Sequence, residues 1–359
     1  MEINPFPATL PNLEKITRPD DFFKSVKEQY SSQVRNGYFS VSDSPAFYIQ
    51  QIEGPQHNYL GIIATVPIQA YRKGLIKGHE ETLEHKGRIQ VELLRERQAM
   101  VKPVLLTYSR VDAIEAWMQH QITQLAPIQN VFFEQDQANY RLWEVKDSAK
   151  LQEIQLLFQQ EVHKAYIADG HHRMLCATAD DLQLASVFCS FYPQDQVLIR
   201  DFNRLIFVPP DFDAPHFLQK LKSVAHLRPL PQGAKPNAKH NVSLYIRSQW
   251  YALRWRDQVL EQKNDLPLLD ASILNREVLQ SLLGVEDLRK TDKVRYMDGQ
   301  KEITDLEVLL QKNENSLLFC LYPVNWSEMV QWADQGRTLP PKSTWFEPRM
   351  KNGLVVQDL

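Results

Sequence analysis

The chain has 359 residues, of which 43% are hydrophobic and 24% are charged, so it can bury a sizeable core and is long enough for two lobes. Its formal net charge of −3 provides no general basic surface, which argues against nonspecific nucleic-acid binding as the main task. Its three widely spaced cysteines argue against a disulfide framework and fit a reducing cytoplasm, and we expect them in the core.

The first half of the chain mixes strand and helix patterns. Its start shows no export signal, and no apolar run is long enough for a bilayer, so we expect a soluble, cytoplasmic protein that contacts no membrane. Apolar, β-branched and aromatic runs predict two hairpins and a single strand, at residues 47–52 with 59–66, 131–133 with 140–145, and 104–108. Apolar residues at helical spacing predict helices at 78–100, 113–125 and 149–160.

The second half begins with a strong loop signal. Segment 228–241 holds three prolines and a glycine. Beyond it the patterns predict strands at 242–246, 250–255, 294–297 and 317–322, and helices near 271–283 and 327–334. The sequence therefore predicts an α+β fold with mixed sheets and flanking helices. We expect two lobes, 1–210 and 211–359, with the tail of the second packing back on the first.

The most polar junction of the chain lies at residues 166–173. Residues 166–168 are typical of the end of a buried strand. Asp169 is typical of a helix cap, and residues 174–179 are typical of a first helical turn. Unpaired backbone N–H groups at such a junction attract a phosphate or carboxylate, Gly170 permits its close approach, and Arg173 can close on it. In the alternative interpretation, Asp169 only caps the helix, while His171 and His172 lie at an ordinary surface.

Two further clusters are candidates for the same site. If a helix begins at Gly78, then His79, Thr82 and Lys86 lie on one side of it, with Glu80 beside them to hold Mg²⁺ or accept a proton. The alternative is a solvated helix end.

The tail segment 336–343 has the spacing of a phosphate-binding P-loop, but Pro341 stands where that motif needs glycine. We therefore interpret Pro340-Pro341 as a stiff lead-in that presents Lys342, Ser343 and Thr344. The pair Asn352-Gly353 predicts a hairpin. Earlier in the chain, Arg204 is suited equally to binding an anion and to pairing with a carboxylate.

Three motifs in the expected order carry a resemblance that covers nearly the whole chain. They are IADGHHR at 167–173, KGHEET at 77–82 and PPKSTWFEPR at 340–349, and the opening Asn4-Pro5-Phe6 and the pair Asn203-Arg204 also match. The chain resembles the bacterial and archaeal domain-of-unknown-function family 1015. That family has no settled activity, so the resemblance implies a fold rather than a reaction. The chain keeps only part of the family's proline-rich stretch near residues 16–22.

A second, distant resemblance rests on one short box. Residues 169–173 followed by Ala177 are similar to the D-G-x-x-R-x-x-x-A box of the ParB and sulfiredoxin superfamily. Members of that superfamily bind nucleotide phosphates there, and some phosphorylate free serine. This resemblance implies a ParB/sulfiredoxin-like core in the N-terminal half and a nucleotide as ligand.

The three motifs lead to one functional hypothesis, in which they converge on a pocket for an anionic metabolite or nucleotide. It is nucleotide-dependent phosphotransfer to a small hydroxyl metabolite, a serine-like amino acid, with ATP or ADP and Mg²⁺ as cofactors. Glu80, Asp169 and His172 are the expected catalytic residues, and Glu80 and Asp169 the expected metal ligands. The expected phosphate- and substrate-binding residues are His79, Thr82, Lys86, Gly170, His171, Arg173, Arg204, Lys342, Ser343 and Thr344. The sequence leaves open a phosphate-ester hydrolase and a noncatalytic metabolite-binding or scaffold protein, so both an enzyme and a binding protein remain candidates.

Overall fold

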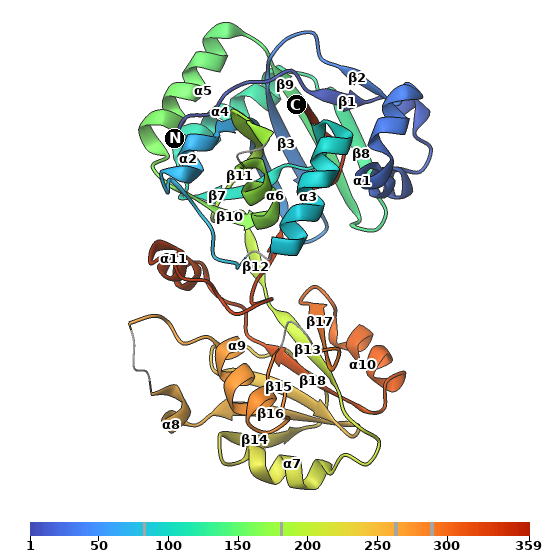
Figure 1. The fold of residues 1–359 in the computed structure, drawn as a ribbon, viewed down its shortest axis with the longest axis vertical. Coiled ribbons are helices and arrows are strands. Elements are labelled where there is room, and N and C mark those ends of the chain that lie inside the picture. Colours follow the sequence, from blue (N-terminus) through green and yellow to red (C-terminus); the bar gives the residue numbers. More distant parts are fainter. Residues whose placement is uncertain (82–83, 180–181, 262–264, 288–290) are drawn as a thin grey trace. The chain divides into compact units, whose positions relative to one another are not determined.

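The computed structural model describes every residue except 82–83, 180–181, 262–264 and 288–290, and the side chains of 84–86 and 88. Contacts between residues divide the chain into two compact units (Figure 1). The first unit is Met1–Leu198 with Pro348–Leu359, and the second is Ile199–Glu347. The proline-rich segment 231–240 lies inside the second unit, where it joins two strands, 225–230 and 241–246, that pair with the same third strand, 249–255. The chain thus passes from the first unit to the second at Leu198, and the expectation from sequence was residue 210.

An eight-stranded mixed sheet forms the centre of the first unit, in the order β5-β10-β7-β11-β4-β3-β9-β8. Neighbouring strands are antiparallel except for the parallel pairs β5–β10 and β7–β11. Its strands are β3 (Phe47–Glu53), β4 (Asn58–Pro67), β5 (Ile76–Lys77), β7 (Val104–Tyr108), β8 (Gln129–Phe133), β9 (Ala138–Val145), β10 (Ala165–Asp169) and β11 (Ser186–Pro193). Both predicted hairpins and the predicted strand at 104–108 are confirmed.

Helices and two small sheets complete the first unit. The helices are η1 (Leu13–Lys15), α1 (Pro19–Arg35), α2 (Ile68–Arg72), α3 (Glu84–Arg97), α4 (Asp112–Gln124), α5 (Ser148–Glu161) and α6 (His171–Ala177). The small sheets pair β1 (Thr9–Pro11) with β2 (Phe39–Val41), and β6 (Ala99–Met100) with β20 (Gln357–Asp358). Helices α3 and α6 lie side by side, and α6 also packs on β7 and β11. The predicted helices at 113–125 and 149–160 are confirmed.

The predicted helix start at Gly78 is wrong, because α3 begins at Glu84 and residues 78–81 form a connection after β5. The backbone N–H of His79 donates to the His171 ring instead of to a helical carbonyl. The predicted hairpin at Asn352-Gly353 is also wrong. Gly353 turns the chain with a φ of +78°, but its N–H donates to Val101 and the strand that follows, β20, pairs with β6.

The second unit contains an antiparallel sheet in the order β14-β16-β15-β18-β13-β17. Its strands are β13 (Phe202–Phe207), β14 (Ala225–Leu230), β15 (Asn241–Ile246), β16 (Gln249–Trp255), β17 (Val294–Asp298) and β18 (Ser316–Leu321), and β12 (Leu198–Arg200) pairs separately with β19 (Trp345–Glu347). The helices are α7 (Ala214–Leu221), α8 (Asp257–Leu260), α9 (Asp270–Ile273), the π-helical η3 (Leu274–Gln280), α10 (Ile303–Gln311) and α11 (Trp326–Asp334). Adjacent residues of β13 belong to two different clusters, Leu205 to one and Ile206 to the other, as expected for a sheet with apolar packing on both faces.

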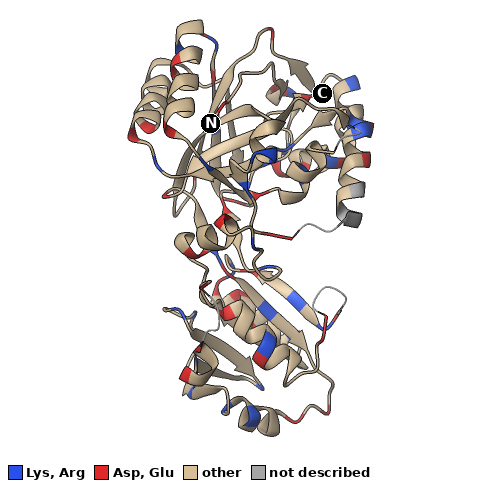
Figure 2. Cartoon of the chain, turned by 60° about the vertical axis from the view of Figure 1, so that its left-hand side comes forward, with Lys and Arg blue, Asp and Glu red and all other residues tan. Residues whose placement is uncertain are grey.

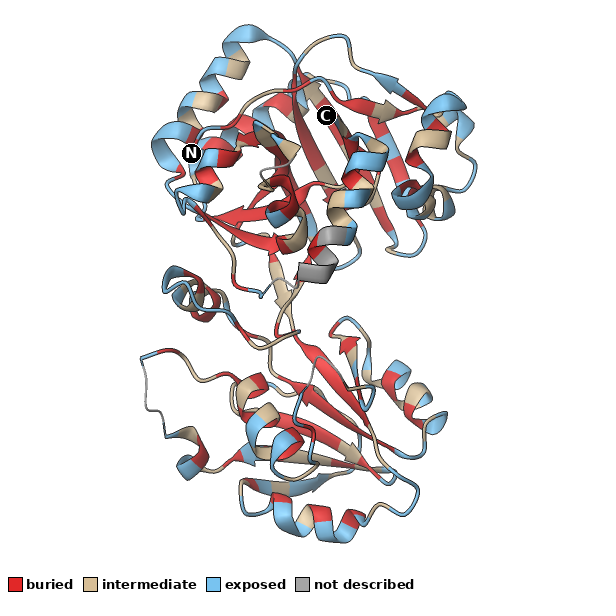
Figure 3. Cartoon of the chain, viewed as in Figure 1, coloured by how far each residue is buried: buried red, intermediate tan, exposed pale blue. Residues whose placement is uncertain are grey.

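The fold is therefore α+β, with a mixed sheet in the first unit, an antiparallel sheet in the second and flanking helices. The strands of both large sheets are mostly buried, whereas the helices keep an exposed side (Figure 3). Cys176, Cys189 and Cys320 are buried free thiols. Acidic and basic positions are interspersed in both units (Figure 2). None of the helices in the described part of the chain has both the length and the apolar character that a bilayer crossing requires.

Candidate functional site

Three segments of the first unit meet at one edge of its large sheet. β5 and β10 run parallel, with Ala165 opposite Ile76, so both strands end at the same edge. β7 runs antiparallel to β10 and therefore begins at that edge. The residues after β5, those after β10 and those before β7 consequently lie together. This arrangement brings residues 77–81 and the motif at 167–173 to one place and adds Lys102, which sequence reasoning missed.

Asp169, the last residue of β10, is surrounded by three cations. Its carboxylate lies 3.1 Å from an Arg173 nitrogen, 3.4 Å from the Lys102 ammonium and 3.4 Å from an Arg349 nitrogen. The predicted capping role of Asp169 is wrong, because Gly170 is the N-cap of α6 and no side chain caps this helix. The carboxylate instead holds three basic side chains that come from separate parts of the chain.

This cluster shifts the pKa values of its members. Burial alone would raise the pKa of the Asp169 carboxyl, but the charges of Arg173, Lys102 and Arg349 outweigh burial and lower it well below its usual value. Burial lowers the pKa of Lys102 to about 8, although Asp169 opposes this shift. At neutral pH Asp169 is therefore ionised, and one negative charge faces three basic groups.

His79 and His171 form a buried pair beside this cluster. Their ring centroids lie 4.6 Å apart with the planes at 87°, and both residues are at most 5% exposed. The His79 backbone N–H donates to His171 Nε2 at 3.2 Å, so the proton of the neutral ring is on Nδ1, which faces a Glu80 carboxylate oxygen at 3.6 Å. Burial lowers the pKa of His171 to about 4 and that of His79 well below 6.5. The neutral pair thus fixes segment 77–80 against the start of α6.

A cavity of about 270 Å³ opens next to Arg173. It is lined by Lys27, Gln90, Leu94, Arg97, Ala99, Met100, Val101, Lys102, Arg173, Cys176 and Asn352. Among these described lining residues four are basic and none is acidic. Arg173 Nε is buried and has no hydrogen-bond partner within the described residues. In the described part of the chain, this site included, no three His, Cys, Asp or Glu side chains are grouped closely enough to share a metal ion.

Gly170 adopts a conformation that other residues rarely accept. Its φ is +105°, and a Cβ atom there would lie 2.7–3.0 Å from the Arg173 guanidinium. We expect Gly170→Ala to lower the free energy of unfolding by about 1–2 kcal/mol through backbone strain, as measured by chemical denaturation. Gly87→Ala in α3 is the matched control, because its Cβ meets nothing within 4 Å. An equal loss of stability in both variants would contradict the assigned strain.

The remaining predicted residues lie in different places. His172 is half-buried in the first turn of α6, and Glu80 is exposed, whereas Thr82 and the side chain of Lys86 lie outside the described part of the chain. The tail motif is divided between the units, with Arg349 in the first and Lys342, Ser343 and Thr344 in the second. Only the tertiary structure shows Arg349 beside Asp169, although it stands inside a motif already visible in the sequence.

Arg204 and the segment 342–343 are brought together in the second unit. Arg204 is 1% exposed, lies over the Tyr296 ring at 5.3 Å, and donates to the backbone carbonyls of Phe202 and Lys342. Burial lowers the pKa of Arg204 to about 10. Ser343 is buried, and its hydroxyl donates to the Pro340 carbonyl at 2.7 Å. The observed bonds of Arg204 and Ser343 thus hold the tail segment against β13.

Several solved structures are similar to this chain at low identity. A free serine kinase in complex with AMP is 13% identical, with a TM-score of 0.40, and the match covers 81% of this chain and 92% of that one. SbnI with a C-terminal truncation, from Staphylococcus aureus, is 11% identical with a TM-score of 0.40 and coverages of 81% and 87%. A conserved hypothetical protein from Pyrococcus furiosus is 12% identical with a TM-score of 0.38 and coverages of 81% and 95%.

A comparison of sequences assigns the family. No curated protein matches the chain significantly. The profile of a family described as "Protein of unknown function (DUF1015)" matches residues 8–273, which is well over half of the chain. The match includes β10, α6 and Lys102 of the site described above. The chain therefore belongs to the DUF1015 family.

Proposed function

We propose that the first unit binds the phosphate groups of a nucleotide in the cavity beside Arg173 and transfers a phosphoryl group to a small hydroxyl metabolite, a serine-like amino acid. The observation that carries this proposal is the excess of positive charge. Three cations surround the single carboxylate of Asp169, and the cavity next to them has four basic and no acidic side chains among its described lining residues. Hydrogen bonds from charged donors to phosphate oxygens are strong in such a partly dehydrated place.

The donor set fits a nucleotide such as ATP or ADP. The planar guanidinium of Arg173 can bind two phosphate oxygens at once, and Lys102 supplies a compact second charge. Asp169 acts as a positioning residue, because its carboxylate is occupied by the cations that it holds. The resemblance of residues 169–177 to a nucleotide-binding box of the ParB and sulfiredoxin superfamily supports the same ligand class.

The proposed reaction needs mainly positioning and charge neutralisation. A phosphorus–oxygen bond to the nucleotide breaks, a new one forms to the hydroxyl oxygen of the metabolite, and the hydroxyl proton passes to a carboxylate. We assign that carboxylate to Glu80, which is exposed next to His171 and is also suited to hold Mg²⁺ together with substrate phosphates. His172, half-buried in the first turn of α6, is the second candidate to contact the substrate.

Arg173→Gln is expected to weaken ADP binding by about tenfold to hundredfold, because it removes a charged donor from the phosphate site. Calorimetric titration of ADP and ATP into the full chain, with and without Mg²⁺, measures this change. ³¹P NMR of the chain with ATP or ADP and serine then detects phosphoserine.

Arg35→Gln is the control, since Arg35 is an exposed arginine at the end of α1 that does not line the cavity. We expect unchanged affinity for it. The affinity of the wild-type chain for ADP should fall between about pH 7 and about pH 9, where Lys102 loses its proton. Absence of heat with every nucleotide, or equal affinity of Arg173→Gln and wild type, would overturn the phosphate site.

One observation favours a second function, a noncatalytic binder of an anionic metabolite. Among the described residues that line the cavity there is no carboxylate to accept a proton. Nucleotide binding without phosphoserine formation, also after replacement of serine by other small alcohols, would support this function. Release of inorganic phosphate from phosphoserine would instead support a phosphate-ester hydrolase.

A further inference from the structure

The second unit contains a cavity of about 410 Å³ on the surface of its sheet, over β14, β16 and β15. Its lining includes four basic side chains, His226, Arg228, Lys235 and Arg254. None of the described residues that line it is acidic. This cavity plays no part in the function proposed above, because it is built entirely from residues of the other unit.

The strand register places three of these basic residues on one face. His226 is opposite Arg254 in the β14–β16 pair, and residues two apart on a strand share a face, so Arg228 points to the same side. Arg228 and Arg254 are diagonal neighbours on this face, and their like charges repel each other. No described residue forms an ion pair with His226, Arg228 or Arg254. The sheet thus holds unneutralised positive charge within one cavity.

A helix covers only one half of this sheet face. Leu230 and Trp250 pack with Leu306 and Leu310 of α10, and the Trp250 indole donates to Glu307 at 2.8 Å. The cavity lies over the other half of this face, which β14 forms with His226 and Arg228 and β16 with Ala252 and Arg254. Arg228 and Arg254 are exposed there. The packing of α10 therefore explains why the cavity is open.

The loop 231–240 forms a wall of the cavity and is fixed at its centre. The Ser243 hydroxyl of β15 donates to the Ala234 carbonyl at 2.5 Å, and the Lys235 ammonium donates to the Gly299 carbonyl at 2.9 Å. Residues of this loop and of β15 thus hold each other in place. Because the wall is fixed by bonds within the unit, the cavity exists before any ligand binds.

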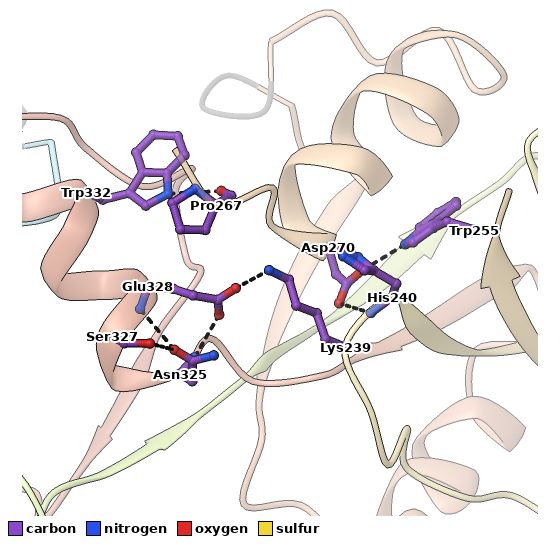
Figure 4. A network of polar contacts seen from close by, with 9 residues as sticks. All are labelled: Lys239, His240, Trp255, Pro267, Asp270, Asn325, Ser327, Glu328 and Trp332. Carbon is purple, nitrogen blue, oxygen red and sulfur yellow. Dashed lines mark hydrogen bonds and ion pairs between the residues drawn. The ribbon is translucent and has the colours of Figure 1, made fainter. Parts of the chain in front are cut away.

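The end of the same loop is fixed by a polar network (Figure 4). Asp270 at the start of α9 accepts the His240 backbone N–H at 3.0 Å and the Trp255 indole N–H at 2.9 Å. Lys239 pairs with Glu328, which also closes the capping box at the start of α11. His240 has a φ of +67°, a conformation that these bonds maintain. A preformed wall lowers the entropic cost of binding.

We infer that this cavity binds a small polyanion, a metabolite with two or more phosphate or carboxylate groups, through Arg228, Arg254 and Lys235. Arg228 and Arg254, which form no ion pair with a described residue, select for negative charge, and two guanidinium groups on neighbouring strands suit two separate oxyanion groups. The neutral side chain of Asn241 in the same lining provides a further hydrogen-bond donor.

Calorimetric titration of pyrophosphate and of citrate into the full chain tests this inference and separates phosphate from carboxylate recognition. We expect at least one of them to bind, with an affinity that falls as KCl rises from about 20 to about 200 mM. The double variant Arg228→Gln/Arg254→Gln should weaken binding by about thirtyfold or more. Because both side chains are exposed, we expect its stability to stay within about 0.5 kcal/mol of wild type for each change.

Two further variants make the result specific. Arg295→Gln, at an exposed position of β17 outside the cavity, should leave binding unchanged. Titration in the Arg173→Gln background, where the phosphate site of the first unit is weakened, separates the two sites, because heat that persists there and is lost on adding Arg228→Gln/Arg254→Gln comes from this cavity. The inference is refuted if neither anion binds more tightly than about 10 mM, or if the folded double variant binds as wild type does.

Discussion

Asp169→Asn is expected to lower the free energy of unfolding of the first unit by about 3 kcal/mol, because it leaves three partly buried cations without their shared carboxylate. For a unit of roughly 200 residues this corresponds to a drop of about 6–12 °C in melting temperature, measured by calorimetry. Only 22% of the Asp169 side chain is exposed, so solvent screens the cluster weakly.

The pH dependence of this loss follows from the lowered pKa of Asp169. A carboxyl whose pKa is lowered by folding stabilises the protein above its unfolded pKa of about 3.9, and this stabilisation is lost as pH falls further. The difference in the free energy of unfolding between Asp169→Asn and wild type should thus be constant from about pH 5 to about pH 7 and shrink below about pH 4.

Asp112→Asn is the control for this variant. Asp112 is 89% exposed and pairs with Arg110 at the surface, and such pairs contribute little. We expect a change within about 0.5 kcal/mol for it. A loss of equal size in the two variants would show that Asp169 does not organise the cations.

Glu115→Gln is expected to stabilise the first unit by about 2–3 kcal/mol at about pH 8. Glu115 on α4 is 5% exposed, and burial raises its pKa to about 7, although Arg110 opposes this shift. Its carboxyl oxygens accept from Gln196 at 2.9 Å and from Tyr108 at 3.4 Å. Glutamine has nearly the same shape and can keep both contacts without a buried charge.

The gain from Glu115→Gln should depend on pH with a defined sign. Folding raises this pKa from 4.5, so the ionised form destabilises the fold, and its cost grows from about pH 4.5 to about pH 7 and then stays constant. We therefore expect little gain at about pH 4.5 and the full gain at about pH 8. Glu161→Gln, at the exposed end of α5, is the control and should change stability by less than about 0.5 kcal/mol at either pH. A gain that is the same at both pH values would argue against a buried ionised Glu115.

Much of the fold could be predicted from local pattern. The runs at 47–52 and 59–66 became β3 and β4, and the periodic segment 149–160 became α5, since alternation and helical spacing are properties of neighbouring residues. The start of α3 could not be predicted in this way. His171, far along the chain, accepts the His79 N–H, and no local pattern contains that bond.

The candidate site was predicted only in part, for a similar reason. Asp169, Gly170 and Arg173 were visible as a polar strand-to-helix junction, and the structure has that junction at β10 and α6. Lys102 was missed because a lone lysine before a predicted strand carries no signal by itself. Its place beside Asp169 depends on the antiparallel pairing of β7 with β10, which is a property of the whole sheet.

The sequence by itself thus determined the α+β class, the two hairpins of the first sheet and the acid, glycine and arginine of the junction, because each depends on residues that are close together in the chain. The tertiary structure alone decided which charges meet. It brings the Lys102 and Arg349 side chains to the Asp169 carboxylate, and it brings Arg228 and Arg254 to one cavity of the other unit. Electrostatic energy depends on the distance between atoms in space, and strand register sets that distance for residues far apart in sequence.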